Sequence, residues 1–471
     1  MGTNSSPDRF RTKLALRVVL ICSLLAANFQ SALAAVLPAP RMQAQLLAPA
    51  LAPKRFIVRD SNGLLGINLS CLLLGCDVLG AIGDPSGQLF VIQNNGPLSA
   101  TAFLAQLLSL TGIVDAEPDQ NGITLAATIQ YPLPSYLTNE APISYYGATV
   151  WTGYVTQTPN QIVRSAQTQS TFAVAGAGVT VAIIDTGVDP NNAILQSHLV
   201  NGYDFTRNQS GGSEMGDLLQ SAAGVIDGST PPAVVNQSVA GVIDQSSAAI
   251  IDQSQYSGFG HGTMTAGIVH LVAPRANIMP LKAFNANGMG YLSDVLRAIY
   301  YAVNHGAKVI SMSFEFTTFS YELSAATYYA ANARVICVAS AGNEGSIETV
   351  YPAGLPTVID VASTSNNNTP STFSNYGMPP VWISAPGEAV MTTYPFNTYA
   401  VGWGTSFSAP FVSGTVALMA SVSSWQSHQL TKTSAASALS HAQPIPYSQY
   451  GYGVLDTYQA VQAWKKSLGW F

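Results

Sequence analysis

Four apolar runs, alternating with helix-like stretches, dominate the chain from about residue 160 onward. They read VTVAIID, KVISMSF, RVICVAS and TVIDVAS, at residues 179–185, 308–314, 334–340 and 357–363. The stretches before the second and third runs, residues 291–306 and 321–333, place apolar residues at helical spacing. Continuous apolar strands that alternate with helices are typical of a parallel sheet covered on both faces. The pattern therefore predicts a doubly wound, mostly parallel α/β fold, with functional groups at the carboxyl ends of the strands.

A smaller set of elements precedes this pattern. We expect a strand, a short helix, two strands joined by a turn at Asp84-Pro85-Ser86-Gly87, a helix capped by Ser99, and a closing strand. These elements cover residues 55–60, 68–74, 76–93, 98–110 and 112–120. The order β-α-β-β-α-β is that of a small ferredoxin-like α+β unit, which we place at residues 55–120. Residues 121–159 would connect it to the larger fold, at residues 160–465.

The N-terminus has the pattern of a targeting signal, which we place at residues 1–34. Basic residues precede the apolar run of residues 18–27, and Ala32-Leu33-Ala34 offers a small-residue cleavage site. A membrane anchor is the alternative, but the run is too short to cross a bilayer comfortably. A linker follows at residues 35–54, and we find no second candidate span. We therefore expect a secreted or periplasmic protein that has no membrane attachment once the signal is removed.

Charge is scarce in this chain. Charged residues make up only 9% of it, against roughly 25% in ordinary soluble domains, and the net charge is −6. Because no basic block is present, we expect binding neither to nucleic acid nor to anionic lipid.

The cysteines outside the signal have two expected roles. Cys71 and Cys76 are close enough in sequence to form a disulfide, which export would permit, and two free thiols are the alternative. Cys337 lies in an apolar run and is expected to be a buried hydrophobic residue. No spacing of Cys and His indicates a zinc site.

Two glycine-flanked segments supply a nucleophile and a base for acyl transfer. In GTSFSAPFVSG, Ser406 precedes an apolar helical run, so it would lie at a helix N-terminus, where the dipole favours developing negative charge. In GHGTMTAGIVH, His261 lies between two glycines that allow close backbone approach, just before another helix. Alone, each would be an ordinary helix cap or a structural histidine. Structural roles are expected for the other histidines, His198, His270, His305, His428 and His441.

Two strand ends complete the set. Asp185 ends VTVAIID and is followed by the sharp Thr186-Gly187 turn, which suits a group that orients a histidine. Asn343, in VASAGNEGS, follows another apolar strand and could donate its amide to a developing oxyanion, with the Ser406 backbone N–H as second donor. By itself each would be a plain turn residue, and only the combination points to catalysis.

The motifs DTG, HGT, AGN and GTS-x-SAP, in the order Asp, His, Asn, Ser, resemble those of the subtilisin family of serine endopeptidases. The resemblance covers residues 160–465 and includes the Tyr351-Pro352 turn and GYGVLD near the C-terminus. It implies a triad of Asp185, His261 and Ser406, with Asn343 as the oxyanion donor. The related sedolisins carry Glu where this chain has His261, which argues against them.

The same resemblance implies how such an enzyme is made and what it needs. Residues 55–120 look like the family's propeptide, an intramolecular chaperone and inhibitor that is removed by self-cleavage and whose trailing segment lies in the cleft until cut. The implied partners are a protein or peptide substrate and the chain's own propeptide, and we expect a monomer. The chemistry needs no cofactor, although structural calcium is frequent in the family. Four acidic residues are candidate calcium ligands, or simply loop carboxylates: Asp189, Asp204, Glu214 and Asp217.

The residues that the resemblance places around the substrate depart from the family pattern at two positions. The set is Ser313, Phe314, Glu315, Ala341, Gly342 and Val350. Glu315 stands where the family usually has glycine, and Val350 stands where many relatives have glycine at the floor of the S1 pocket. Glu315 and Glu344 would favour a basic residue before the scissile bond, whereas Val350 would favour a small one. Both alternatives stay open.

Four related units, VIDGS, VVNQS, VIDQS and IIDQS, recur within residues 225–254, in an insertion that we place at residues 208–256. The last unit contains Asp252, a second aspartate that follows apolar residues and precedes His261. One sibling unit has Asn at this position, and a position that accepts Asn is not expected to hold the orienting charge. We therefore assign that charge to Asp185. Stacked short strands and a solvated loop are the two alternatives for the repeats.

Three classes of function compete for this sequence. The first is an active, secreted peptidase made as a self-processing zymogen. The second is a catalytically silent relative that acts as a binding protein, and the presence of all four chemical residues argues against it. The third is an exported hydrolase of another acyl substrate, such as an ester, but the sequence has no GxSxG nucleophile elbow.

Overall fold

The computed structural model describes residues 54–123, 134–218, 240–242, 256–377, 381–422 and 430–469. All of them belong to the compact unit Pro53–Phe471. The predicted signal, nearly all of the linker, most of the repeats and His428 lie outside the described residues.

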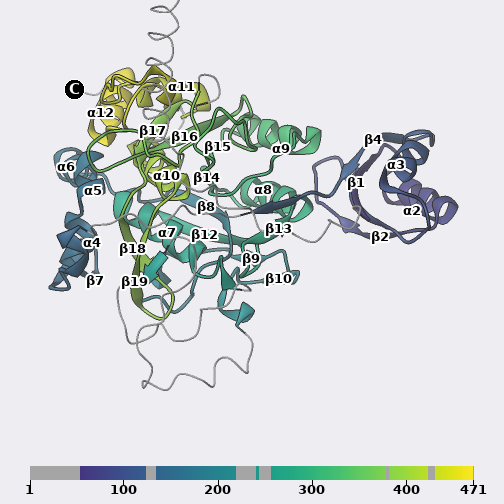
Figure 1. The fold of residues 1–471 in the computed structure, drawn as a ribbon, viewed down its shortest axis with the longest axis horizontal. Helices are drawn as coiled ribbons and strands as arrows, with labels where there is room; N and C mark the ends of the chain where they lie inside the picture. The colour runs from purple at the N-terminus through teal and green to yellow at the C-terminus, as the bar shows by residue number, and fades with distance from the viewer. Residues whose placement is uncertain are drawn as a thin grey trace, which may run out of the picture. The chain divides into compact units, whose positions relative to one another are not determined.

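An eight-stranded sheet forms the centre of the larger fold (Figure 1). Neighbouring strands from β9 to β17 run parallel, and the edge pair β10–β9 is antiparallel. In spatial order the strands are β10 (Gln209–Ser210), β9 (Tyr203–Asp204), β12 (Asn277–Lys282), β8 (Thr180–Asp185), β14 (Val309–Met312), β15 (Ile336–Ser340), β16 (Val358–Thr364) and β17 (Ile383–Pro386). This is the doubly wound, mostly parallel architecture predicted from the apolar runs.

Successive residues of the central strands face opposite sides of the sheet, and helices cover each side. Val181 and Ile183 of β8 pack in one buried cluster, and Ala182 and Ile184 pack in the other. The first side is covered by α7 (His261–Val272), α10 (Thr405–Val422), α11 (Lys432–Leu439) and α12 (Thr457–Ser467), and the second by α8 (Leu292–Asn304) and α9 (Tyr321–Asn332). Burial on both faces explains why these strands read as continuous apolar runs.

The helix α10 is the central core helix. Among the described helices it alone is long and apolar enough to cross a membrane, but 89% of its apolar window is buried inside the protein. It packs against α7 and against β14, β15 and β16. Its apolar character is therefore explained by its place in the core.

A three-stranded antiparallel sheet contains the one described piece of the repeats. Its order is β11 (Ala240–Val242), β19 (Thr398–Gly402) and β18 (Val390–Tyr394). The strand β11 pairs with β19 rather than with another described strand of the insertion. The remaining repeat units lie outside the described residues, so the two alternatives for them stay open.

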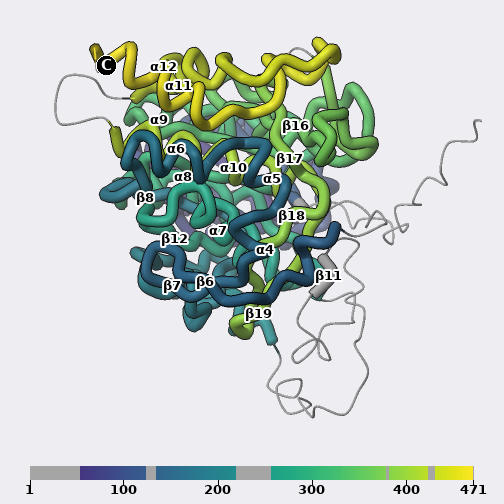
Figure 2. Tube along the Cα trace, turned by 90° about the vertical axis from the view of Figure 1, so that its left-hand side faces the viewer, coloured from purple at the N-terminus to yellow at the C-terminus, as the bar shows by residue number. Residues whose placement is uncertain are grey.

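A segment of short elements leads from the connecting region into the large fold. Figure 2 shows its three helices as a dark blue stretch across the face that carries α10 and β18. One anchor is the Tyr154 hydroxyl, which donates to the Gly267 carbonyl of α7 at 2.6 Å. The elements are β6 (Pro142–Tyr145), β7 (Ala148–Trp151), α4 (Thr152–Thr156), α5 (Thr158–Ile162) and α6 (Ser165–Phe172). Short 3-10 helices occur at Ser135–Thr138, Gln196–His198, Met215–Asp217 and Ser448–Tyr450.

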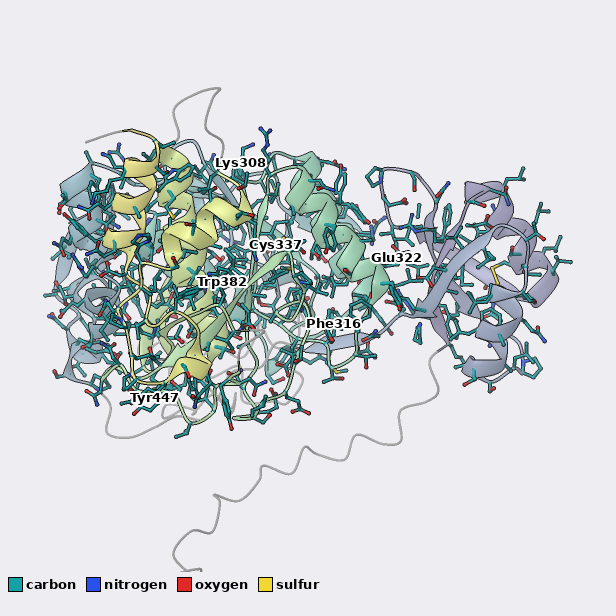
Figure 3. All side chains as sticks on the ribbon, turned by 90° about the horizontal axis from the view of Figure 1, so that it is seen from above. Lys308, Phe316, Glu322, Cys337, Trp382 and Tyr447 are labelled. Atoms are coloured by element: carbon teal, nitrogen blue, oxygen red, sulfur yellow. A yellow bond between two sulfur atoms is a disulfide. The ribbon has the colours of Figure 1, made fainter. Side chains whose placement is uncertain are left out.

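The small unit is a four-stranded sheet, in the order β2-β3-β1-β4, with two helices on one face (Figure 1). Its elements are β1 (Arg55–Asp60), α2 (Gly63–Leu74), β2 (Cys76–Ala81), β3 (Leu89–Asn94), α3 (Ala100–Leu108) and β4 (Ile113–Pro118). They follow the predicted order β-α-β-β-α-β. Ser99 caps α3 as expected, by accepting a hydrogen bond from the Ala102 N–H at 3.3 Å. Cys71 and Cys76 form a disulfide at the end of α2 (Figure 3).

The helix α2 begins earlier than the predicted start at residue 68. Gly63 and Gly66 hid its first turns from sequence reasoning, because glycine is a poor helix former. Close packing accounts for the second glycine, since a Cβ atom on Gly66 would come within 2.6 Å of Asn62 Cβ. The outer face of the helix consists largely of leucines that are more than half exposed, Leu64, Leu65, Leu69, Leu72 and Leu73.

Two carboxylates of the small unit contact helix N-termini of the large fold. Asp119 accepts hydrogen bonds from the backbone N–H and the hydroxyl of Ser293, at 2.9 and 2.8 Å, at the start of α8. Glu117 accepts one from the Tyr321 N–H at 3.1 Å, at the start of α9. A negative group is stabilised at a helix N-terminus by the unpaired N–H groups and the helix dipole. These contacts therefore act as helix caps supplied from another part of the chain.

The strand β5 (Asn121–Ile123) follows the small unit and lies between two segments of the large fold. It pairs antiparallel with β13 (Met289–Tyr291), just before α8. On another side, Gly122 lies against the segment that follows β14. A Cβ atom on Gly122 would come within 2.7 Å of the Phe316 ring and 3.1 Å of the Glu315 carbonyl oxygen.

Candidate active site

His261 and Asp185 form a buried hydrogen-bonded pair. His261 Nδ1 lies 2.7 Å from Asp185 Oδ1, and their side chains are only 6% and 1% exposed. Asp185 ends β8 and His261 begins α7, so the pair joins the carboxyl end of a central strand to a helix N-terminus. The Thr186 N–H and the Thr265 hydroxyl also donate to the Asp185 carboxylate, at 2.7 and 3.2 Å. These bonds fix the carboxylate against the Nδ1 side of the ring.

Two glycines allow this pair to form. A Cβ atom on Gly262, the residue after the histidine, would overlap the Gly187 carbonyl oxygen. Gly187 has a φ of 105°, a conformation that glycine adopts far more readily than other residues. The turn after Asp185 and the start of α7 can therefore approach each other closely.

Ser406 lies in the first turn of α10, next to the helix that begins with His261. Its backbone carbonyl accepts a hydrogen bond from the Ser313 hydroxyl at 2.9 Å, and its hydroxyl lies 3.5 Å from the Ser313 carbonyl oxygen. The ring of Phe407 is 5.8 Å from the His261 ring, centroid to centroid. Within the described ranges, the buried Nε2 of His261 has no hydrogen-bond partner. The nucleophile and base candidates thus lie at the N-termini of two packed helices, with the Phe407 ring of one beside the His261 ring of the other.

Asn343 follows β15 and is held by the residue before Ser406. Its Oδ1 accepts hydrogen bonds from the backbone N–H and the hydroxyl of Thr405, at 2.9 and 3.0 Å. Because these bonds fix the carbonyl end of the amide, its NH₂ end is turned away from Thr405. An amide oriented in this way beside a helix N-terminus can donate to an oxyanion.

Glu214 is a buried carboxyl group next to the Asp185–His261 pair, and sequence reasoning missed its contribution there. It accepts hydrogen bonds from the Gly260 N–H at 2.7 Å and from the hydroxyls of Thr186, at 3.2 Å, and Thr263. It thereby joins the turn after Asp185 to the start of α7. Burial raises its pKa to about 8, although hydrogen bonds and Lys282 act in the opposite direction. The available signal was indirect, since DTG and HGT each carry a threonine whose buried hydroxyl needs an acceptor.

The four carboxylates named as calcium candidates all have protein partners. Asp204 and Asp217 form ion pairs with Arg207. Asp189 accepts hydrogen bonds from the N–H groups of Asn191 and Phe396, at 2.9 Å each. The described part of the chain contains no group of three or more His, Cys, Asp or Glu side chains arranged to hold a metal ion. These contacts do not decide between calcium ligands and loop carboxylates, so both alternatives for the four residues stay open.

Five of the six predicted substrate-binding residues lie on two segments beside Ser406. On the first, Ser313 contacts Ser406 directly, and Phe314 and Glu315 follow it, both buried. On the second, Ala341 and Gly342 lead from β15 to Asn343. Val350 lies elsewhere, 3% exposed in the core cluster that contains Phe314 and Phe316.

The other described histidines make structural contacts. His270 is buried, its Nδ1 lies 3.2 Å from the Tyr154 hydroxyl, and burial lowers its pKa to about 3. The His198 ring packs against it, 5.2 Å away between centroids. In His305 and His441, Nδ1 lies within hydrogen-bond reach of main-chain carbonyls one turn earlier. These four histidines lie outside the site formed by His261.

Comparison with known proteins identifies the family. The subtilase family model (peptidase S8) matches residues 176–453. Thermitase from Thermoactinomyces vulgaris is 35% identical over 256 residues, which are 52% of this chain and 76% of thermitase. The thermophilic serine proteinase of Bacillus sp. strain AK1 is 30% identical over 299 residues, which are 62% of this chain and 63% of that protein.

A solved structure supports the same fold. The crystal structure of fervidolysin from Fervidobacterium pennivorans, a keratinolytic enzyme related to subtilisin, matches with a TM-score of 0.65 at 21% identity. The match covers 89% of this chain and 62% of fervidolysin, and at this identity it shows the fold alone. The subtilisin-like sheet, the buried Asp185–His261 pair and the family match together lead to one conclusion: the chain belongs to the subtilase family and is a serine endopeptidase.

Proposed function

We propose that the protein is a secreted endopeptidase made as a self-processing zymogen, in which Ser406 is the nucleophile, His261 the general base and Asp185 the group that orients the base. The observation that carries this assignment is the buried 2.7 Å pair of Asp185 and His261, at the start of a helix that packs against α10. The Asp, His and Ser roles of an acyl-transfer triad are defined by such geometry rather than by position in the sequence.

The first half of the reaction forms an acyl-enzyme. Ser406 Oγ attacks the carbonyl carbon of the scissile bond while its proton moves to His261 Nε2. Asp185 accepts a hydrogen bond from the Nδ1–H of His261 and stabilises the imidazolium that forms. The negative carbonyl oxygen accepts hydrogen bonds from the Asn343 amide and the Ser406 N–H. His261 then gives its proton to the leaving amine, the C–N bond breaks, and the acyl group stays on Ser406 as an ester.

The second half releases the acyl group. A water molecule gives a proton to His261 as its oxygen attacks the ester carbonyl, and the same donors stabilise the second oxyanion. The Ser406 oxygen leaves and takes the proton back from His261. The products are two peptides, and the enzyme returns to its starting state with no cofactor consumed.

The small unit, residues 55–120, is the inhibitory propeptide in this proposal. Its support is the set of contacts with the large fold: the caps by Asp119 and Glu117, and the 2.5 Å ion pair of Arg59 with Glu322 on α9. Figure 3 labels Glu322, on the side of α9 that faces the small unit. The strand β5 continues from this unit along β13 and past Glu315, on the segment that contacts Ser406. The first self-cleavage would fall in the connecting segment beyond it, within residues 124–159.

Secretion rests on the N-terminal targeting pattern, and the substrates would be proteins or peptides in the surrounding medium. The mature enzyme would be a monomer without attachment to membrane or nucleic acid, inhibited by its own propeptide until that is degraded. Structural calcium, if present, would be bound apart from the reacting groups.

A serine-directed phosphonate tests the assignment. The wild-type protein, freed of the small unit, should be labelled at Ser406, as located by peptide mass spectrometry, and His261→Ala should abolish the labelling. The intact chain should also release a smaller mature form. If the wild-type protein is neither labelled nor processed and cleaves no unfolded protein, the silent, binding-protein alternative replaces this proposal.

A further inference from the structure

Glu315 and Glu344 form a pair of neighbouring carboxyl groups. A Cβ atom on Gly342 would come within 3.1 Å of Glu315 Oε2 and 2.8 Å of Glu344 Oε2, so the two groups converge at this glycine. Glu315 is 6% exposed and Glu344 is exposed, so the pair extends from the core to the surface. Two carboxyl groups can share a hydrogen bond only when one of them carries a proton.

The pair lies where a peptide substrate would pass. Glu315 is two residues from Ser313, whose hydroxyl binds the Ser406 carbonyl, and Glu344 is adjacent to Asn343. The chain itself already places extended backbone there, since Gly122 of β5 lies against the Glu315 carbonyl oxygen. A side chain just ahead of the scissile bond would therefore meet the pair.

The groups around the pair leave its negative charge uncompensated. The Asn375 amide donates to Glu344 Oε2 at 2.6 Å, and Glu348 adds further negative charge. No described Lys, Arg or His acts on Glu315. Burial, followed by the charge and hydrogen bond of Glu344, raises the pKa of Glu315 to about 9. The Glu315 carboxyl group therefore favours its protonated form at neutral pH.

The sequence around the proposed first cut limits which residues the substrate site must accept before the scissile bond. Between Arg59 and Arg164 there is no Lys or Arg, so any first cut within residues 124–159 follows a residue that is not basic. A site with two ionised carboxylates would disfavour such a cut, whereas a site that holds a shared proton would permit it.

We propose that the Glu315–Glu344 pair gives the enzyme a proton-dependent choice of the residue before the scissile bond: uncharged residues while the pair holds its proton, and Lys or Arg once the proton is released. When a basic side chain enters, the shared proton passes to solvent and the cation lies between two carboxylates. An uncharged side chain leaves the proton in place. The inference rests on the proposed function, because it concerns the same substrate site.

Matched peptides that differ only in the residue before the scissile bond, Lys against Leu, test this choice. The ratio of kcat/KM for Lys to that for Leu should rise by up to tenfold per pH unit between pH 6 and about 9 and then level off, because one proton is released. Glu315→Gln, which cannot ionise, should remove most of this rise, and Glu344→Gln should do the same.

The outcomes separate this inference from the function on which it rests. If the wild-type enzyme cleaves both peptides but the ratio does not change with pH, the inference is wrong and the peptidase assignment stands. A rise that persists unchanged in both glutamine variants would also overturn the inference. If no peptide is cleaved at any pH, the proposed peptidase function is itself wrong, and the inference falls with it.

Discussion

Gly122, in the strand β5 that follows the small unit, packs against the phenyl ring of Phe316, so closely that a Cβ atom would come within 2.7 Å of the ring. This contact joins the end of the small unit to the segment that begins at Ser313, which binds Ser406. The route from the small unit to the reacting serine is thus one continuous set of contacts. Self-processing should depend on it.

Substitution of this glycine should slow self-processing. Gly122→Val would overpack the contact with Phe316. Overpacking typically costs about 1–3 kcal/mol, which corresponds to a roughly tenfold or larger decrease in the equilibrium constant for docking of β5 against this segment. The measurement is the rate of appearance of the mature form, followed by mass spectrometry. Gly80→Val is the matched control, because a Cβ atom on Gly80 of β2 meets no other atom within 4 Å. Equal processing rates in the two variants would show that β5 does not guide the first cut.

Asp185 and Asp252, which each follow Ala-Ile-Ile upstream of His261, should behave differently. Asp185→Asn removes the charge that faces His261 Nδ1, and kcat should fall by about 10⁴-fold, the scale seen when the corresponding aspartate of subtilisin is removed. Asp252→Asn should leave kcat within about twofold of wild type. Steady-state kinetics on one peptide substrate compares them directly, and a large loss in the Asp252 variant would reverse the assignment.

The amide of Asn343 should matter in the transition state rather than in binding. Asn343→Ala should lower kcat by about 10²–10³-fold with little change in KM, the effect known for the oxyanion amide of subtilisin. The Thr405 contacts that orient the amide would be lost as well, so thermal unfolding should be measured in parallel. A variant with wild-type kcat would exclude Asn343 as the donor.

Glu214 should make the stability of the fold depend on pH. Its pKa is raised from an ordinary value of 4.5 to about 8, so the folded protein holds this proton more tightly than the unfolded chain does. The resulting stabilisation is complete below about pH 4.5 and is lost as the pH rises through about 8. The change is at most roughly a few kcal/mol, since one pKa unit corresponds to about 1.4 kcal/mol.

Urea unfolding of the Ser406→Ala protein, which cannot digest itself, measures this dependence between pH 5 and 9. Glu214→Gln in the same background should flatten part of the decline, because glutamine stays neutral throughout. Glu140→Gln, at an exposed carboxylate, should retain the full decline. If the Glu214 variant declines as steeply as its parent, another buried carboxyl group is responsible.

Much of the fold could be predicted because the sheet is buried on both faces. Val181 to Ile184 are all apolar, and such runs specify a parallel sheet without information from distant residues. The start of α2 could not be predicted, because Gly63 and Gly66 oppose helix formation locally and are accommodated by packing. The pairing of β11 with β19 joins segments more than 150 residues apart, and no local pattern encodes it.

The candidate site also contains some residues that local sequence predicts and others that it does not. Asp185, His261, Asn343 and Ser406 each lie in a short motif at the end of a strand or the start of a helix, so local sequence was enough to propose them as site residues. Glu214 has no motif, and its partners Gly260 and Thr263 lie more than 40 residues away along the chain. The meeting of Glu315 with Glu344 likewise depends on two strand ends that only the folded sheet brings together.

The most direct test of the account is hydrolysis of a denatured protein by the mature enzyme and by two serine variants. Ser406→Ala should lower kcat by about 10⁶-fold, the loss observed when the nucleophile of subtilisin is removed. Ser408→Ala, which changes a neighbouring buried serine of the same helix, should retain activity within about tenfold. All three proteins can be prepared by supplying the first cut with an external protease. Loss of hydrolysis in the Ser406 variant alone is the predicted result, and hydrolysis at the wild-type rate by the Ser406→Ala protein would contradict the assignment.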